Sequence, residues 1–400
     1  MSIAFCVKVG VSSCYHRHLM RTRILRFLSI FVLAFNSRAA SAIAQDRTLP
    51  EAVYLNSGHS ERDLAVQLVT KRVVFIGEIH ERYDHHLNQL ELIRQIHELD
   101  PNLTIGVEYF QQPFQSQVDS YISGQISETE FLRDTEYFQR WGYDYRLYAP
   151  IFRYAREQHI PVRALNVPTA LVSEVAKVGI TGLPEKDRAY LPREIRPADG
   201  AYRERLFEAF QEHKDTRPGA FDHFVDAQLV WDEGMAESAS TYMNANSNRR
   251  MVILAGAGHL EFGSGIPTRL QRRTNATYAI VLSSGEEIEP HIADYLMLSG
   301  KEDLPSVGSL SVNLIERDGA CRIGSLSAGG AGEIAGLRKG DILVTIDGQN
   351  IKMLADARLA LWNKKPGDLV RIEVHRKRFF WGPADVHFDV KLNASTEPAV

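Results

Sequence analysis

Polar side chains lie in or directly behind four apolar, β-branched runs of this sequence, and their types could hold a ligand or move protons. They are Glu78 and His80 behind the run 73–77, Glu108 within 104–110, Asn166 within 161–167, and His259 behind 251–258. In open α/β sheets, ligands bind outside the carboxyl ends of the strands, so these side chains are candidates for a common site. Glu108 is the strongest single signal, because a carboxylate in a buried strand is unfavourable unless it is paired or metal-bound.

Two Gly-x-x-His elements, GEIH at 77–80 and GAGH at 256–259, repeat one local pattern at two strand ends. Glycine permits a sharp exit from a strand, so each imidazole would be delivered to the sheet edge. His80, His259 and Glu108 could together bind a catalytic divalent metal with open positions, although their spacing matches no known zinc motif. Each histidine alone also fits a hydrogen-bonded loop or cap residue. His85 and His86, which open the next predicted helix, fit solvated or capping roles better.

An aromatic and basic stretch, 136–156, lies between the second and third runs. Such side chains can wall a planar cofactor, because tyrosine hydroxyls ligate haem iron and arginines pair with carboxylates such as the haem propionates. Tyr145 and Tyr148 are the candidate iron ligands, and Arg146 is a candidate propionate partner. The alternative is plain packing of aromatic rings, which suits Phe152 best. Asp232, on a later predicted helix, could orient a strand-end histidine or be solvated.

The elements that must position these residues alternate short β-branched runs with longer helical periods. That alternation is typical of an α/β domain with a mostly parallel sheet flanked by helices. Strands are predicted at 73–77, 104–110, 161–167, 251–258 and 276–282. Leucines and isoleucines recur at helical spacing over 87–96, as a crossover helix requires, and 168–250 is mostly helical. Near residue 300 a polar, Gly- and Pro-punctuated linker precedes short strands with a different rhythm.

The composition limits the class of protein. Of the 400 residues, 44% are apolar, which is enough for two domain cores. A formal net charge of -4, from 46 basic and 50 acidic residues, gives no electrostatic reason to expect a nucleic-acid partner or an anionic membrane surface. The sequence has no Cys-x-x-Cys-His motif, which excludes the usual covalent attachment of haem.

The first 44 residues fit a secretory signal peptide. Arginines precede an apolar run that is about a dozen residues long, shorter than the roughly twenty needed to span a bilayer. Ala42 and Ala44 then favour cleavage after Ala44. An uncleaved amphipathic anchor is the alternative, because Arg26 interrupts the run. No cysteine directly follows the run to carry a lipid anchor, so we expect a soluble periplasmic or secreted protein.

Taken together, six segments that contain these residues resemble the ChaN-like family of haem-binding proteins. The resemblance rests on FIGEIHERYDHHLNQLELIR, GVEYF, FLRDTEYFQRWGYDYRLYAPIFRYAR, VRALNVP, FVDAQLVWDEGMAESA and LAGAGHLEFGSGIPTRL, and it spans about 60–285. That family is grouped with Tiki, TraB and erythromycin-esterase-like proteins, several of which are hydrolases, some using metal. The resemblance implies haem held by tyrosine near a pocket formed by His80, Glu108 and His259. Because relatives often bind haem at a subunit interface, it also implies a homodimer.

The segment 306–393 resembles a PDZ domain, most clearly in the run AGLRKGDILVTIDG. The resemblance implies a β-rich α+β fold that binds an extended or C-terminal peptide by strand addition. Leu310, Ser311 and Val312 would form the peptide-facing loop and strand. Ser311 stands where the glycine of that loop is expected, which weakens the case for a C-terminal peptide. The alternative is a packing or oligomerisation domain.

The sequence therefore predicts a signal peptide over 1–44, a ChaN-like domain over 45–298 and a PDZ domain over 306–393. The favoured function is an exported haem-binding protein of haem or iron uptake or trafficking, whose PDZ domain meets a peptide or protein partner. The alternative is a metal-dependent hydrolase in which His80, Glu108 and His259 hold a divalent metal or perform acid–base work on a PDZ-presented substrate.

Overall fold

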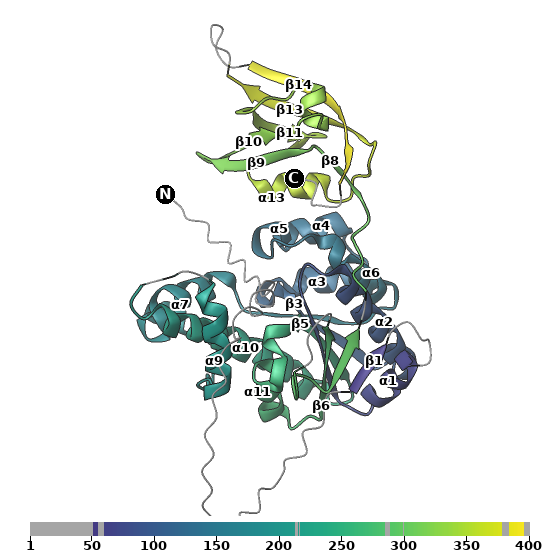
Figure 1. Cartoon of the computed structure of the whole chain (residues 1–400), viewed down its shortest axis with the longest axis vertical. Coiled ribbons are helices and arrows are strands. Elements are labelled where there is room, and N and C mark those ends of the chain that lie inside the picture. Colours follow the sequence, from purple (N-terminus) through teal and green to yellow (C-terminus); the bar gives the residue numbers. More distant parts are fainter. Residues whose placement is uncertain are drawn as a thin grey trace, which may run out of the picture.

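The computed structural model describes residues 51–54, 60–212, 215, 217–284, 289–298, 300–377 and 384–395. The expected signal peptide over 1–44 lies outside these described residues. None of the helices in the described ranges is both long and apolar enough to cross a bilayer. Figure 1 shows two bodies, an α/β domain and a smaller β-rich domain that follows it.

A parallel sheet forms the centre of the first domain, with its seven strands in the order β1-β7-β6-β2-β5-β3-β4. The strands are β1 (Glu51–Tyr54), β2 (Val73–Glu78), β3 (Leu103–Gln111), β4 (Val162–Asn166), β5 (Arg250–Gly256), β6 (Tyr278–Ser284) and β7 (Tyr295–Leu298). β2 to β6 are the five strands expected from the sequence. The predicted α/β fold with a mostly parallel sheet is confirmed.

Helices cover both faces of this sheet. They are α1 (Ser60–Leu68), α2 (Tyr83–Leu99), α3 (Gln115–Ile122), α4 (Glu128–Asp134), α5 (Tyr137–Arg140), α6 (Ala149–Glu157), α7 (Thr169–Gly182), α8 (Glu185–Arg188), α9 (Gly200–Gln211), α10 (Ala220–Ala245) and α11 (Ile266–Thr274), with short 3-10 turns that include η1 (Gln112–Phe114), η2 (Tyr145–Leu147), η3 (Ala257–His259) and η4 (Glu261–Gly263).

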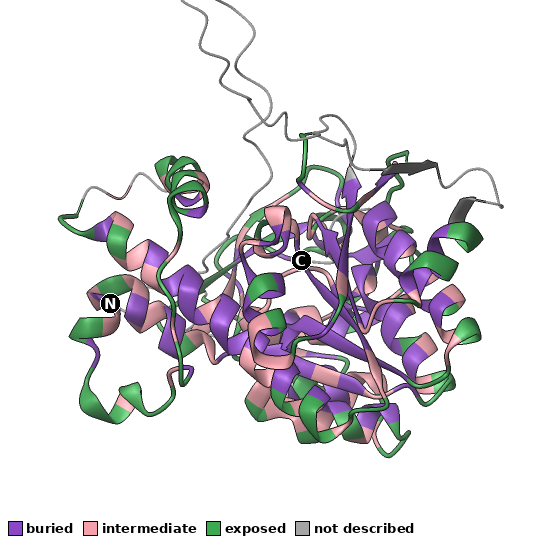
Figure 2. Cartoon of the chain, turned by 90° about the horizontal axis from the view of Figure 1, so that it is seen from below, coloured by how far each residue is buried: buried purple, intermediate pink, exposed green. Residues whose placement is uncertain are grey.

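Each central strand is buried on both faces, as the continuous apolar runs of the sequence require. In β2, Val74 and Ile76 belong to the core cluster that includes residues of α1, α2 and α6, whereas Val73 and Phe75 belong to the cluster that includes residues of α10 and α11. Figure 2 shows the strands coloured as buried and the exposed residues on the outer faces of the helices. The sheet is therefore a rigid support for the loops at its carboxyl edge.

β4 is an edge strand, and side chains cover part of its backbone. Gln115 accepts a hydrogen bond from the Ala164 N–H (2.8 Å) and donates one to the Val162 carbonyl (2.8 Å). Gln112 donates to the Leu165 carbonyl (2.8 Å). The two bonds of Gln115 replace those that a strand on the open side of β4 would make, because the Pro161 carbonyl bonds β3 and the backbone groups of Val162 and Ala164 therefore point away from β3.

The second domain is built on an antiparallel sheet with the order β14-β13-β11-β10-β9, in which β12 also pairs with β11. Its elements are β8 (Val307–Ser309), β9 (Val312–Arg317), β10 (Ala320–Leu326), α12 (Ala331–Ala335), β11 (Ile342–Ile346), β12 (Gln349–Asn350), α13 (Leu354–Leu361), β13 (Leu369–Arg376), β14 (Ala384–Lys391) and β15 (Asn393–Ser395). β15 pairs with β8. The β-rich second domain is confirmed, and β9 lies at an edge of its sheet.

Helix α13 joins the two domains. It contacts α4 and α5 of the first domain as well as β9 of its own domain, and Figure 1 shows it facing α4 and α5. Trp362, directly behind α13, is buried in the core cluster of the first domain, where its ring meets Tyr145 edge-on at 5.6 Å. The second domain is therefore packed against the first through this helix.

Candidate functional site

The strand-end residues expected from the sequence come together at the carboxyl edge of β2, β3 and β5. Glu108, from β3, accepts a hydrogen bond from the Gly256 N–H (2.8 Å), and its other oxygen is 3.5 Å from Nε2 of His259. The His80 ring lies against Gly256, because a Cβ placed on that glycine would be 2.9 Å from Cε1 of His80. Together with Glu78 and Asp232, these residues form what we call the strand-end site.

A carboxylate fixes the ring of His80. Oε1 of Glu78 lies 2.5 Å from Nδ1 of His80, and Oε2 of the same carboxylate is 2.8 Å from Nδ1 of His86. Burial alone would lower the pKa of His80, but the Glu78 and Glu108 carboxylates outweigh it, so the pKa of His80 is raised. Burial works in the opposite sense on Glu78, yet His86 and His80 hold the pKa of Glu78 below its usual value. An ion pair at the end of β2 therefore leaves the Nε2 side of His80 for a ligand.

His259 is fixed by a second carboxylate. Its Nδ1 is 2.7 Å from Oδ1 of Asp232, which is fully buried on α10, and Oδ2 of Asp232 accepts a hydrogen bond from the Tyr202 hydroxyl (2.6 Å). Burial alone lowers the pKa of His259, but Glu108 and Asp232 together raise that pKa to about 9. Near neutral pH, His259 is therefore a cation held between Glu108 and Asp232.

Solvated or capping roles were expected for His85 and His86. The solvated role is wrong, because both side chains are buried at the start of α2, and the N-cap residue of that helix, Arg82, makes no side-chain cap hydrogen bond. Nδ1 of His85 accepts a hydrogen bond from the Ile79 N–H (3.1 Å), and burial lowers the pKa of His85 to about 4. Nε2 of His86 lies 3.1 Å from the backbone carbonyl of His80. These two histidines hold the loop that carries His80.

The structure places the predicted haem residues Tyr145 and Tyr148 in the core behind the strand-end site. The Tyr145 hydroxyl donates to Glu128 (3.2 Å), whereas the Tyr148 hydroxyl accepts from the Trp141 indole N–H (3.0 Å). Neither side chain is exposed, and burial raises the pKa of both hydroxyls well above the ordinary value. Neither is brought together with Glu108 and His259, so ligation by either tyrosine stays a prediction.

Two aromatic side chains that sequence reasoning did not select lie directly on His80. The ring centroids of Trp141 and Tyr143 are 5.0 Å and 4.8 Å from that of His80, and Tyr143 is partly exposed. Gly142, at φ +84°, makes the turn between them. The aromatic stretch 136–156 pointed to this region of the chain. The sequence alone does not show which of its tyrosines lies outside the core. Nothing in the sequence pointed to Tyr202, because its helix, α9, is separated along the chain from every strand that ends at the site.

The strand-end site contains imidazoles and carboxylates, but among the described residues they are not arranged as a metal site. No three His, Cys, Asp or Glu side chains there are arranged to hold a metal ion. Both oxygens of Glu108 already face protein groups, the Gly256 N–H and the His259 ring. The predicted set of His80, Glu108 and His259 is thus brought together as a hydrogen-bonded acid–base cluster.

The predicted peptide-binding residues Leu310, Ser311 and Val312 lie where β9 begins. Ser311 has φ +55°, a conformation that favours glycine, and its N–H donates to the Ser309 hydroxyl (3.0 Å). The Leu310 carbonyl accepts from the Gly332 N–H (2.8 Å). Serine thus adopts the conformation expected of the loop glycine, but its amide is already hydrogen-bonded inside the domain.

Comparison with known families identifies the class of protein. Residues 64–270 match the family model described as haem-binding uptake, Tiki superfamily, ChaN, and residues 308–392 match the PDZ domain. The chain therefore belongs to the ChaN haem-binding uptake family and carries a C-terminal PDZ domain, which confirms the two resemblances drawn from the sequence.

Individual relatives are distant. The chain is 24% identical over 271 residues to protein RETICULATA-RELATED 5, chloroplastic, of Arabidopsis thaliana, a match that covers 60% of this chain and 36% of the relative. The chain thus spans about a third of the length of that curated relative. A structure titled cofacial heme binding to ChaN of Campylobacter jejuni is 16% identical, with 58% of this chain and 89% of that chain covered and a TM-score of 0.48. The PDZ domain of a carboxy-terminal protease from Vibrio cholerae, in complex with peptide, is 18% identical, with 22% and 97% covered and a TM-score of 0.20.

Proposed function

We propose that this chain is an exported haem-binding protein of haem or iron uptake or trafficking, whose PDZ domain meets a peptide or protein partner. Membership of the haem-binding uptake family supports the ligand. The observation that carries the proposal is the partly exposed Tyr143 packed on His80, because a phenol oxygen is a haem-iron ligand and the neighbouring rings offer apolar faces to a porphyrin. We therefore propose Tyr143 as the iron ligand, with Tyr145 and Tyr148 as the competing candidates.

A haemin titration of the purified chain tests this proposal. Wild type should bind saturably with the absorbance spectrum of high-spin, tyrosinate-ligated iron, Tyr143→Phe should lose that spectrum, and Tyr145→Phe should retain it. No saturable binding would overturn the proposal. Loss of the spectrum in Tyr145→Phe or Tyr148→Phe, with Tyr143→Phe unaffected, would move the ligand to the core tyrosines.

Export is supported by the charge and apolar pattern of residues 1–44. When the full chain is expressed in a bacterium with a periplasm, the exported form should begin at Gln45. N-terminal sequencing of the periplasmic or secreted fraction measures this. Recovery of the uncleaved chain in the membrane fraction would instead favour the amphipathic anchor.

A homodimer is part of the proposal, because the family resemblance implies haem at a subunit interface. Light scattering of the chain with and without haemin should give twice the monomer mass in the haem-bound sample. A monomer under both conditions would restrict the haem site to one copy.

A hydrolase is the second candidate, favoured by the acid–base geometry of the strand-end site. His80 and His259 each have Nδ1 held by a carboxylate, and His259 faces Glu108. That arrangement orients an imidazole for proton transfer. In an assay against a panel of esters, any activity should fall roughly 100-fold or more in His80→Ala, His259→Ala and Glu108→Gln. Stoichiometric metal in the wild type, lost in both histidine variants, would support the metal-dependent form of this alternative.

A further inference from the structure

A groove lies beside the edge strand β4, where that strand, α10 and the segment 189–193 line it together. Its volume is about 560 Å³, within the range of roughly 300–1,000 Å³ that is usual for small-molecule sites. None of its lining residues belongs to the strand-end site. The groove is therefore a separate place where the first domain could bind a ligand.

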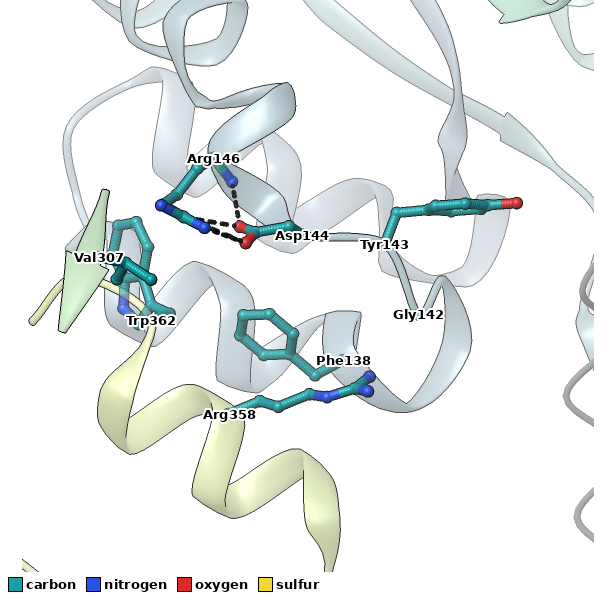
Figure 3. Close-up of a pocket in the computed structure, with 8 residues that line it drawn as sticks. All are labelled: Phe138, Gly142, Tyr143, Asp144, Arg146, Val307, Arg358 and Trp362. Carbon is teal, nitrogen blue, oxygen red and sulfur yellow. Dashed lines mark hydrogen bonds and ion pairs between the residues drawn. The ribbon is translucent and has the colours of Figure 1, made fainter. Parts of the chain in front are cut away.

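The pocket at the junction of the two domains is a poorer candidate. It holds only about 20 Å³, which is room for about one water molecule. Figure 3 shows Asp144 aimed at Arg146 in this pocket, and the ion pair between them, 2.6 Å long, already satisfies both charges. Of these two cavities, the groove beside β4 is the one that can hold a small molecule.

Small side chains on one face of α10 leave the room that the groove occupies. Gly234, Ser238, Thr241 and Ala245 follow one another at spacings of four, three and four residues, so they share one face of the helix. All four line the groove. Larger side chains at these positions would fill the groove, so its presence follows from the sequence of α10.

Arg163 brings a cation into the groove. The alternation of a strand places Arg163 on the same face of β4 as Leu165, which packs in the core cluster that includes residues of α10. The guanidinium lies over the ring of Tyr242, 4.9 Å from its centroid, and the Tyr242 hydroxyl is hydrogen-bonded with Thr104 (3.2 Å). The cation is thus held in place by an aromatic ring that is itself fixed.

The charge of Arg163 has no counter-ion in the described part of the chain. Its Nε is buried without a hydrogen-bond partner. Glu237 also lines the groove, but its carboxylate is engaged by Arg193, whose backbone N–H donates to Oε2 (2.9 Å) and whose Nε is 3.3 Å from Oε1. A partly buried guanidinium is stabilised by a carboxylate or a phosphate, so the group that best completes the groove is an anion.

The rest of the lining suits a body that carries hydroxyl groups. The hydroxyls of Ser238 and Thr241 line the groove, and a hydroxyl both donates and accepts hydrogen bonds. Tyr190, also in the lining, is 69% exposed and offers an aromatic face with a polar tip. A ligand with one anionic group and several hydroxyls therefore matches both parts of the groove.

We propose that the groove beside β4 is a second ligand site, which binds a small hydroxylated organic anion, a sugar acid or a sugar phosphate, through Arg163. The anionic group pairs with the Arg163 guanidinium, and the hydroxyls of the ligand bond with Ser238 and Thr241. This site is distinct from the strand-end site, so the proposal does not depend on haem binding.

Isothermal titration calorimetry of the full chain with three probes tests the proposal. Glucuronate carries a carboxylate, glucose 6-phosphate carries a phosphate, and glucose has the hydroxyls without a charge. At least one charged probe should bind saturably, and glucose should bind more weakly on the order of tenfold, because hydrogen bonds to a charged group are absent. The better of the two charged probes identifies the anionic group.

Arg163→Met keeps most of the length of the side chain but removes the cation. It should weaken binding of the charged probe on the order of tenfold and leave binding of glucose within about twofold. Arg94→Met is the matched control, because Arg94 also lies over a tyrosine ring, that of Tyr154 at 5.4 Å, but is outside the groove. The control should bind the charged probe as the wild type does.

A second variant keeps the test decisive if Arg163→Met folds poorly. Thr241 is exposed on α10, so Thr241→Trp places a large ring in the groove without disturbing the core. It should keep the circular dichroism spectrum of the wild type and lose binding of the charged probe.

Three results would overturn the proposal. They are no saturable binding of either charged probe to the wild type, equal affinity of the wild type for the charged probe and glucose, and wild-type affinity in a folded Thr241→Trp variant. An equal loss in Arg163→Met and Arg94→Met would likewise remove the assignment to Arg163.

Discussion

His80 occupies its place only because residue 256 has no side chain. A Cβ on Gly256 would lie 2.9 Å from Cε1 of His80 and 3.2 Å from its Nε2, so the imidazole would have to shift from the position in which Glu78 holds it. The backbone of Gly256, at φ -55°, is open to any residue, so steric contact alone decides the effect.

Gly256→Ala should therefore weaken haemin binding and destabilise the fold by about 1–3 kcal/mol, the range for overpacking a filled core. Denaturant unfolding and the haemin titration measure the two effects. Gly200→Ala is the control, because a Cβ at that helical position meets no atom within 4 Å and should leave stability unchanged or raise it by about 0.5–1 kcal/mol. Equal behaviour of the two variants would contradict the close contact.

The paired His259 makes stability depend on pH on the alkaline side. Its pKa is about 9 in the folded chain against an ordinary 6.5, so the folded state holds the proton more tightly than the unfolded state. The stabilisation is fully present below pH 6.5 and is lost as pH rises through about 9, with a magnitude up to about 3 kcal/mol. Denaturant unfolding from pH 6 to pH 10 should show this fall in wild type and a shallower one in His259→Gln. Parallel profiles would show that His259 is not held as a cation.

At the level of elements, most of the framework of the site could be predicted because its strands are continuous apolar runs. β2, β3 and β5 are buried on both faces, and the residues that end them necessarily meet at one sheet edge. β1 and β7 were not predicted. They are four-residue strands in remote parts of the chain, and short runs carry little periodicity to read.

The site was less predictable than its framework, because packing between elements decided it. Tyr143 and Tyr145 are two residues apart in one aromatic stretch. The ring of Trp362, directly behind α13, packs on Tyr145, whereas Tyr143 stays partly exposed. Asp232 could be orienting or solvated from sequence alone. Only the crossing of α10 behind β5 places its carboxylate on His259.

Helix α13 should carry much of the stability of the domain interface. Trp362→Ala should destabilise the protein by about 3–5 kcal/mol, because it removes a large buried ring from the core cluster around Tyr145. Leu369→Ala, at a leucine that is 66% exposed, should change stability by less than about 0.5 kcal/mol. Thermal unfolding followed by circular dichroism measures both. A small effect at Trp362 would mean that the domains are only loosely docked.

For the whole molecule, the contact of α13 with α4 and α5, close to the proposed iron ligand Tyr143, predicts that haem tightens the junction of the two domains. Amide hydrogen exchange should slow in α13 when haemin is added at about 100 times its dissociation constant, where binding contributes about 2.7 kcal/mol. The β13–β14 hairpin is the internal reference, because it lies on the opposite side of the PDZ domain from β9 in the sheet order. Protection confined to β2 and β3, with α13 unchanged, would place haem wholly within the first domain.

The Gln115 side chain beside β4 limits pairing between the sheets of two copies of this chain. A foreign strand that tried to extend the parallel sheet at this edge would find the Ala164 amide and the Val162 carbonyl already satisfied by Gln115. Growth of a fibril by strand addition needs a row of unpaired backbone groups, and at this edge the Ala164 amide and the Val162 carbonyl are already paired. The PDZ domain presents β9 at the edge of its own sheet, so the two sheets of the molecule differ in how many backbone groups they leave for an added strand.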